Sequence, residues 1–206
     1  MKYKTIIVVI ISALLIAAGI YYFFRKPDLI TNYPSKGTDI IAFGDSLVEG
    51  YGSTTGKDFV SQLSLKIGQP IINLGKSGDI TADGIARINE LDKYNPKVVL
   101  LLLGGNDRLR KVPIAETHKN LATLIENIQK RGSIVLLLGV KGGLFNDVFG
   151  GEFINLKDTY HTAFVSDVLD GLFGNPEYMS DEIHPNDIGY KKIADKIYPV
   201  LIKLIK

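Results

Sequence analysis

The sequence of 206 residues has no cysteine and only three histidines. The absence of cysteine excludes a disulfide framework, a thiol nucleophile, iron–sulfur ligation and every cysteine-based zinc site. It also excludes a lipid anchor, which would need a lipobox cysteine. Internal repeats and low-complexity tracts are absent as well, and the length suits one domain with a real core. We expect neither a metal nor a cofactor.

An excess of one charge is also lacking. The formal net charge is +2 at pH 7, and the only charged side chains before residue 28 are Lys2, Lys4, Arg25 and Lys26. Without these four, 20 basic and 22 acidic residues remain, so residues 27–206 carry a charge of about −2. A mildly acidic body with few histidines predicts that the protein does not bind nucleic acid.

Residues 6–24 form a long apolar run without charge or proline. As a helix, its 19 residues span roughly 29 Å, the thickness of the hydrocarbon layer of a bilayer. The run ends in four aromatic residues, and two basic residues follow it. This pattern is typical of a membrane interface. We therefore predict a membrane anchor within residues 1–26, with the body in the periplasm or at the cell surface. A signal peptide cleaved near residues 17–19 is the alternative.

Residues 27–37 are polar and contain Pro34 and Gly37, which predicts a linker before one domain in residues 38–206. In that domain, β-rich runs with continuous hydrophobicity alternate with helical patterns. Continuous hydrophobicity is typical of parallel strands buried on both faces, so we predict a three-layer α/β/α fold of flavodoxin-like type with a mostly parallel sheet. Residues 141–180 show no clear period and are expected to be irregular, apart from one short strand. The expected strands are residues 38–43, 70–74, 98–103, 134–140 and about 162–165, and the expected helices are residues 56–67, 114–131 and 188–205.

Ligands bind at the carboxyl ends of the strands in such folds, and a serine stands at the first of these ends. Ser46 follows the strand directly, two residues after Gly44, so its hydroxyl is a candidate nucleophile. The alternative is that Ser46 only caps a helix. The elbow motif Gly-x-Ser-x-Gly of the α/β-hydrolases is absent, because Val48 occupies the second glycine position.

Glycine-rich turns follow the next two strands. Gly75 and Gly78 let the backbone approach a ligand and expose an amide, as in an oxyanion hole or a phosphate loop, and an ordinary turn explains them equally well. Asn106 follows two glycines, so its carboxamide is a candidate donor to a developing oxyanion. Its alternative role is that of a turn residue or helix cap.

Two Asp-x-x-His pairs are candidates for a general base with its orienting carboxylate: Asp181 with His184, and Asp158 with His161. The spacing is the same in both, so it does not choose between them. The third histidine, His118, lies on or beside the apolar stripe of a predicted helix, and we expect a structural role for it.

Together and in this order, these blocks resemble those of the SGNH hydrolases, also called the GDSL family of lipases and esterases. The resemblance covers about residues 39–200. It implies that Ser46 is the nucleophile, His184 the base and Asp181 its orienting carboxylate, and that the amides of Ser46 and Gly78 and the side chain of Asn106 form the oxyanion hole. The matching blocks are residues 44–47 (GDSL), 77–78 (SG), 104–107 (GGND) and 181–185 (DEIHP).

The resemblance also selects between the two histidine pairs, since Pro185 and Asn186 after His184 match the family. Residues 79–88 and 104–113 are similar to the branch that contains multifunctional thioesterases, lysophospholipases and arylesterases. The family therefore implies a serine esterase acting on small acyl esters or thioesters, and we expect a monomer. Residues 141–146 (KGGLFN) replace the proline-containing substrate loop of that branch, so the resemblance does not extend to acyl-chain preference.

Three other functions compete with this prediction. One is a carbohydrate O-acetyl esterase of the same family. Another is a non-catalytic flavodoxin-like module that binds phosphate or a nucleotide, for which only Lys76 and Arg108 offer positive charge at the loops. The last is an inactive scaffold, which the intact Ser46, Asn106 and His184 argue against.

Overall fold

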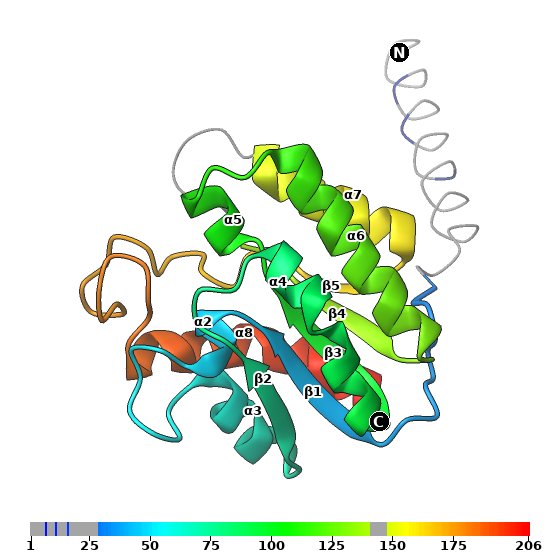
Figure 1. The fold of residues 1–206 in the computed structure, drawn as a ribbon, viewed down its shortest axis with the longest axis horizontal. Coiled ribbons are helices and arrows are strands. Elements are labelled where there is room, and N and C mark those ends of the chain that lie inside the picture. The colour runs from blue at the N-terminus through cyan, green and yellow to red at the C-terminus, as the bar shows by residue number, and fades with distance from the viewer. Residues whose placement is uncertain (1–6, 8–10, 12–15, 17–28, 141–147) are drawn as a thin grey trace.

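The structure, a computed structural model, describes residues 7, 11, 16, 29–140 and 148–206 (Figure 1). These residues form a five-stranded parallel sheet in the order β2-β1-β3-β4-β5. The strands are β1 (Asp39–Gly44), β2 (Ile71–Gly75), β3 (Pro96–Leu102), β4 (Ile134–Leu138) and β5 (Ala163–Val165). The helices are α2 (Ser46–Glu49), α3 (Phe59–Ile67), α4 (Thr81–Ala86), the 3₁₀ helix η1 (Ile88–Lys93), α5 (Gly105–Leu109), α6 (Ile114–Lys130), α7 (Val148–Tyr160) and α8 (Asp187–Ile205).

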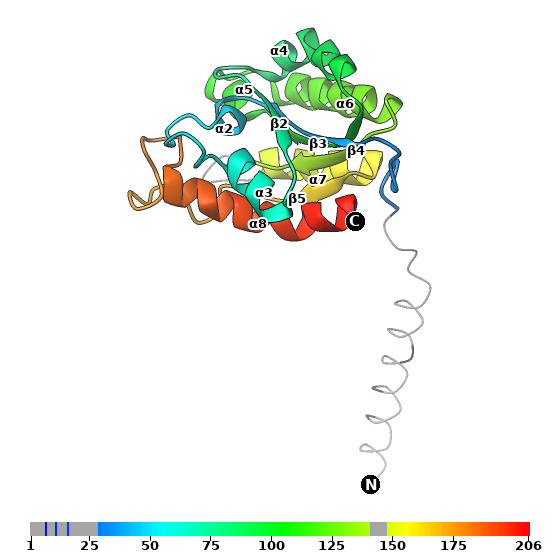
Figure 2. The same ribbon diagram turned by 90° about the horizontal axis from the view of Figure 1, so that it is seen from below.

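Helices cover both faces of the sheet, which gives three layers (Figure 2). Helices α3 and α8 pack on one face, and α4, α6 and α7 pack on the other. Along β1, Ile40 and Ala42 face the α3/α8 layer, whereas Ile41 and Phe43 face the opposite layer. Burial on both faces explains the continuous apolar runs, and the predicted α/β/α architecture with a parallel sheet is confirmed.

Three strands end side by side at the carboxyl edge of the sheet. Gly44 of β1 pairs with Gly75 of β2 on one side and with Leu102 of β3 on the other. The chain then folds back so closely that a Cβ at Gly75 would lie 2.0 Å from the backbone nitrogen of Glu49 in α2. Only glycine fits this approach. The strand order reverses between β1 and β3, so the loops that follow them leave a crevice at this edge.

Helix α7 lies in the stretch that we expected to be irregular. Gly150 and Gly151 lower its intrinsic helix propensity by about 1 kcal/mol each, which hides the helix from pattern reading. Phe149, Phe153 and Leu156 are nevertheless buried against the α6 side of the sheet, at the spacing of one helical face. Packing therefore stabilises this helix, and the spacing of these three residues was the signal that could have revealed it.

The segment before β1 is hydrogen-bonded to the body. The side-chain amide of Asn32 donates to the carbonyl oxygens of Gln129 (2.8 Å) and Ser133 (3.0 Å), and the hydroxyl of Ser35 donates to that of Gly132 (2.8 Å). These bonds attach the described part of residues 27–37 to the loop between α6 and β4. The predicted boundaries between anchor, linker and domain stay predictions.

The prediction of a membrane anchor needs correction. In the part of the chain that the structure describes, no helix has both the length and the apolar character to cross a membrane. Most of residues 6–24, on which the prediction rested, lie outside that part. A run of apolar residues has the composition of a membrane span, but composition alone does not establish one. We therefore withdraw the transmembrane helix, the membrane as a partner and the membrane-anchored location of the body.

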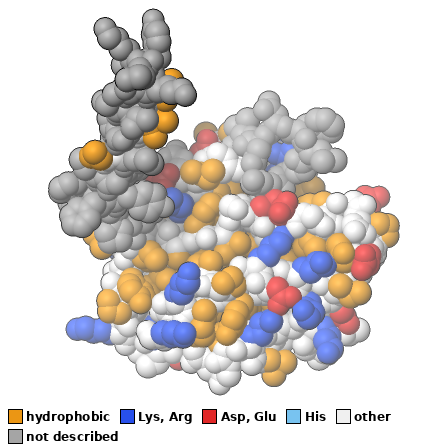
Figure 3. Space-filling view, turned by 180° about the vertical axis from the view of Figure 1, so that it is seen from behind, with side chains coloured by type: hydrophobic (Ala, Val, Ile, Leu, Met, Phe, Trp, Pro, Cys, Tyr) orange, Lys and Arg blue, Asp and Glu red, His pale blue; other side chains and the backbone are white. Residues whose placement is uncertain are grey.

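The face of the molecule opposite to that of Figure 1 carries a mixed surface, in which basic and acidic side chains lie among hydrophobic ones (Figure 3). One ion pair joins α3 to α8, with the Asp195 carboxylate 2.7 Å from Lys66 Nζ, and a second lies within α8, where the same carboxylate is 2.8 Å from Lys191 Nζ. Exposed pairs of this kind contribute little, so the buried residues beneath them supply most of the stability of the contact.

Candidate active site

Ser46 lies at the carboxyl end of β1 as the first residue of α2. The helix is capped by Asp45 instead, whose Oδ1 accepts a hydrogen bond from the backbone nitrogen of Leu47 at 3.0 Å. The Ser46 hydroxyl is therefore not engaged in capping. Its Oγ lies 3.1 Å from Nε2 of His184, a residue 138 positions later in the chain.

The ring of His184 bridges Ser46 and Asp181. Its Nδ1 lies 2.8 Å from Oδ2 of Asp181, and the other carboxylate oxygen accepts hydrogen bonds from the backbone nitrogens of Ile183 (2.8 Å) and His184 (2.7 Å). Burial acts to raise the pKa of Asp181, but these hydrogen bonds outweigh it and lower the pKa below its usual value. An ionised carboxylate at Nδ1 favours the tautomer with the proton there, which leaves Nε2 free to accept from Ser46.

The loop that carries His184 is held in two ways. Within the loop, the backbone nitrogen and the hydroxyl of Ser180 donate to the carbonyl oxygen of His184 at 2.8 and 3.0 Å. From outside it, the ring of Tyr51 packs against the imidazole with 4.5 Å between ring centroids. The buried hydroxyl of Tyr190 in α8 donates to the carbonyl oxygen of Tyr51 at 2.7 Å, which fixes that residue in turn.

Asn106 in α5 directs its carboxamide to the same edge of the sheet. Its Nδ2 donates to the backbone carbonyl oxygen of Asp79 at 3.0 Å. A carboxamide nitrogen carries two hydrogens, so one remains for a substrate oxygen. Gly78, one residue before Asp79, has a φ of 84°, and its carbonyl accepts a hydrogen bond from Arg110 at 2.7 Å.

These groups open onto a cavity of about 630 Å³. Its wall at the strand ends carries Ser46, Asn106 and His184, and most of the remaining lining is apolar. Of the described residues, Gly78 is not among those that line the cavity, so this candidate lies in the neighbouring loop. The apolar lining residues are Leu47, Leu109, Val140, Leu169, Phe173 and Ile183, and the charged ones, besides Asp45, are Arg108, Asp167 and Asp170.

Asp45 also lines this cavity, and the residue is 3% exposed. Burial raises its pKa to about 7, the hydrogen bond from the Leu47 amide opposes this shift, and the charges of Asp79 and Asp107 add to it. Near neutral pH the side chain therefore changes charge beside Ser46. This perturbed group could not be predicted from the sequence, because burial of an aspartate after a strand depends on the packing of the whole edge.

The remaining histidines lie elsewhere. His161 directly precedes β5, at the opposite edge of the sheet from Ser46. His118 of α6 contacts Glu152 of α7, with 2.5 Å between Nδ1 and the carboxylate, so it joins two helices. Within residues 29–140 and 148–206, no cluster of three or more potential ligand residues could hold a metal ion.

In a flavodoxin-like fold, a serine, a histidine and an aspartate joined in one hydrogen-bond chain at the strand ends form an arrangement typical of serine hydrolases. The chain belongs to the GDSL-like lipase/acylhydrolase family, whose profile matches residues 42–192, and it is accordingly a hydrolase of ester bonds. This confirms the resemblance seen in the sequence.

Individual relatives agree with this assignment. The chain is 31% identical over 176 residues to an arylesterase of Vibrio mimicus, covering 80% of this chain and 88% of the relative. It is 27% identical to the thioesterase 1/protease 1/lysophospholipase L1 of Escherichia coli K12, covering 81% and 85%. Among solved structures, the crystal structure of TesA superposes with a TM-score of 0.77 at 28% identity, covering 81% of this chain and 99% of that one.

Proposed function

We propose that this chain is a serine esterase that hydrolyses carboxylic esters or thioesters of acyl chains, with Ser46 as nucleophile, His184 as general base and Asp181 as its orienting carboxylate. The observation that carries the proposal is the hydrogen-bond chain in which His184 lies 3.1 Å from the Ser46 hydroxyl and 2.8 Å from the Asp181 carboxylate. Such a nucleophile, base and orienting group within hydrogen-bond reach are what covalent acyl transfer requires.

In the first half of the reaction, Nε2 of His184 takes the proton of Ser46 while Oγ attacks the carbonyl carbon of the substrate. The electron pair of the C=O bond moves to the oxygen, and the negative Asp181 stabilises the imidazolium that forms. When the tetrahedral intermediate collapses, the leaving alcohol or thiol takes the proton from His184. Ser46 is left as an ester of the acyl group.

In the second half, His184 takes a proton from water, whose oxygen attacks the carbonyl carbon of this serine ester. The second tetrahedral intermediate expels Ser46 Oγ, which recovers its proton from His184, and the free carboxylic acid leaves. Over the whole cycle, water supplies the hydroxyl of the acid and replaces the proton that Ser46 gave, through His184, to the leaving alcohol or thiol.

The negative oxygen of both intermediates needs donors. We assign this role to the second amide hydrogen of Asn106 and to the backbone N–H groups of Ser46 and Gly78. Ser46 opens α2, so its N–H has no partner within the helix. Asn106 lines the same cavity as Ser46, which supports its part in the set. Donors held in advance act on a charge that exists only in the intermediates.

The lining of the cavity supports an acyl chain as the group that is transferred. Six apolar side chains from α2, α5 and the regions after β4 and β5 surround the space beside Ser46. An acetyl group on a sugar would use little of this surface and would leave it in water. The arylesterase and thioesterase relatives point to the same substrate class.

The proposal is tested with p-nitrophenyl esters of increasing chain length, an acyl thioester series and acetylated sugars. We expect kcat/KM to rise from acetyl to longer acyl groups in both the ester and thioester series. Ser46→Ala should lose this activity and its labelling by a fluorophosphonate, whereas Ser64→Ala on α3 should keep both. Labelling of another serine would refute the assignment of Ser46, and activity confined to acetyl esters and acetylated sugars would refute the acyl-chain substrate.

A further inference from the structure

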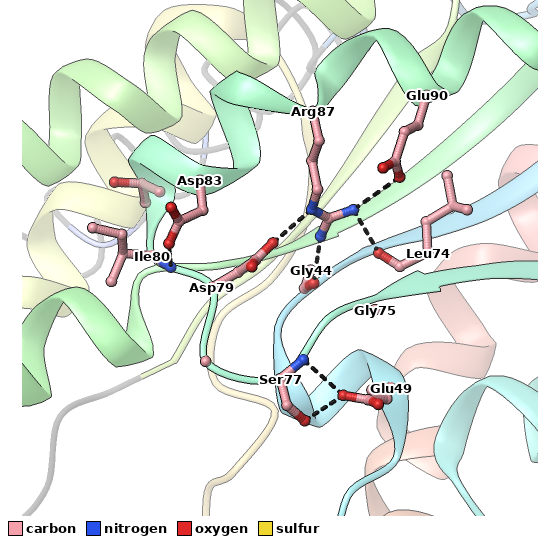
Figure 4. Close-up of polar contacts among 12 residues, drawn as sticks. Gly44, Glu49, Leu74, Gly75, Ser77, Asp79, Ile80, Asp83, Arg87 and Glu90 are labelled. Atoms are coloured by element: carbon pink, nitrogen blue, oxygen red, sulfur yellow. Dashed lines mark hydrogen bonds and ion pairs between the residues drawn. The ribbon is translucent and has the colours of Figure 1, made fainter.

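Arg87 lies between α4 and η1, and its guanidinium reaches the carboxyl edge of the sheet (Figure 4). Its Nη2 donates to the carbonyl oxygen of Gly44 at 2.8 Å, and its Nη1 donates to that of Leu74 at 3.0 Å. Its Nε lies 2.5 Å from the Asp79 carboxylate, and Glu90 is a further partner at 3.3 Å. One side chain thus joins the ends of β1 and β2 to the loop after β2.

Two of these attachment points, Gly44 and Asp79, lead directly to the proposed oxyanion donors. Gly44 is two residues before Ser46, and Asp79 is bonded covalently to Gly78. The carbonyl oxygen of Asp79 also accepts the hydrogen bond from Asn106. Each donor is therefore connected to the Arg87 guanidinium through one or two residues.

The guanidinium itself has little freedom. Its side chain is 11% exposed and that of Asp79 is 7% exposed, so neither charge is well solvated without the other. One face of the guanidinium lies over the ring of Phe43, with 4.1 Å between Cζ and the ring centroid. Since the donors of arginine form a rigid planar fork, fixing this plane fixes the direction of every bond it makes.

We propose that Arg87 is a positioning residue that holds the oxyanion donors in register around Ser46. The inference rests on the proposed function, because it takes these groups to be the donors. An N–H donor displaced by about 1 Å loses much of its effect on a transition state, whereas binding of the ground state changes little. Loss of Arg87 should therefore lower kcat and leave KM nearly unchanged.

Arg131 offers a matched control. It makes a similar set of bonds, with Nε and Nη2 each 2.8 Å from Asp92 and Nη1 2.7 Å from the carbonyl oxygen of Asn127. These bonds join the end of α6 to η1, away from the strand ends that carry Ser46. Arg131→Met therefore removes an arginine network of comparable size without touching the donors.

The test compares Arg87→Met with Arg131→Met on a p-nitrophenyl ester, at a temperature where denaturant titration shows both to be folded. We expect Arg87→Met to lower kcat by about 10- to 100-fold with KM within about twofold of the wild type. Arg131→Met should leave both constants within about twofold. Arg87→Lys, which keeps the charge and loses the fork, should recover only part of kcat.

A double-mutant cycle with Asn106→Ala separates positioning from general loosening. If Arg87 acts partly through Asn106, the two losses are not fully additive, and Arg87→Met costs less when Asn106 is already absent. Fully additive losses, or a folded Arg87→Met protein with the kcat of the wild type, would overturn the inference.

Removing the arginine alone leaves Asp79 buried without its partner, so Arg87→Met can fail to fold. Arg87→Met combined with Asp79→Asn removes both charges together and serves as the second variant. The same drop in kcat is expected for it, and an unchanged kcat would again overturn the inference. Failure of the proposed function has a different signature, since the wild-type protein would then lack fluorophosphonate labelling at Ser46.

Discussion

The two halves of the candidate site are built differently. The Ser46 side follows directly from the sheet. Asp45 and Ser46 are 3% and 9% exposed, and Gly44 and Gly75, at the ends of β1 and β2, let α2 pack against the sheet edge. The Asp181 side is a loop, where the Asp181 side chain is 45% exposed and most hydrogen bonds run between neighbours in the sequence.

This difference separates two tasks. The proposed nucleophile and oxyanion donors need fixed positions, and the sheet supplies these positions through long-range contacts such as those of Arg87. The base needs the right tautomer and a contact with Ser46, and a short loop with its own hydrogen bonds supplies these, braced by Tyr51. Changes on the Ser46 side should therefore act on kcat through the donors, and changes on the loop should act through His184.

The largest effect is expected from removing the base. His184→Ala should lower kcat by about 10³- to 10⁴-fold, because it removes the nitrogen that lies 3.1 Å from the Ser46 hydroxyl and is placed to take its proton. His161→Ala is the matched control and should cost at most a few-fold. Initial rates on a p-nitrophenyl ester check both. If His161→Ala were the damaging change, the base would belong to the other Asp-x-x-His pair.

Asn106→Ala tests the sheet side. We expect kcat to fall by about 10²- to 10³-fold with little change in KM, because the charge that the amide meets exists only in the transition state. Asn127→Ala on α6, where the amide donates to a carbonyl of its own helix, should leave both constants unchanged. A raised KM at constant kcat would instead make Asn106 a substrate-binding residue.

Ser180→Ala loosens the loop without touching the reacting groups. Loss of its 3.0 Å hydrogen bond to the His184 carbonyl should lower kcat by about 3- to 10-fold and stability by about 1 kcal/mol. Ser35→Ala removes a comparable bond, 2.8 Å to the carbonyl of Gly132 on the other side of the molecule, and should cost stability alone. Equal kcat for the two variants would mean that the loop does not depend on this bond.

Asp45→Asn should affect stability more than rate, and its effect depends on pH. Because burial raises the pKa of Asp45 to about 7, the folded state keeps this proton between pH 4 and 7 while the unfolded state releases it. The wild type therefore loses stability as pH rises through that range, by at most about 4 kcal/mol, and the loss levels off above it. Asparagine keeps the cap for Leu47 and has no proton to lose. Denaturant unfolding at pH 5 and pH 8 measures this. The free energy of unfolding of Asp45→Asn, relative to that of the wild type, should be higher at pH 8 than at pH 5. The same difference at both pH values would contradict a raised pKa.

The sequence predicted the layers and strands well, because burial on both faces leaves continuous apolar runs such as that of β3. It also marked Ser46, Asn106 and His184, since strand ends and glycine turns are local features. The spacing could not decide between the two Asp-x-x-His pairs, because that choice depends on which histidine the fold brings next to the end of β1. Arg87 was missed for a similar reason: a lone arginine in a helical stretch reads as a solvated charge, and only the register of β1 and β2 brings carbonyl oxygens to it.

The proposed mechanism requires that Ser46 carries the acyl group during turnover. The direct measurement is acid quenching of the wild-type protein with a p-nitrophenyl ester in the steady state, followed by mass spectrometry of its peptides. We predict one acyl group per chain on the peptide that contains Ser46, and none in Ser46→Ala. An acyl group on another residue would contradict the serine-ester mechanism. Rapid turnover would also contradict it if quenching at early times and at low pH traps no adduct.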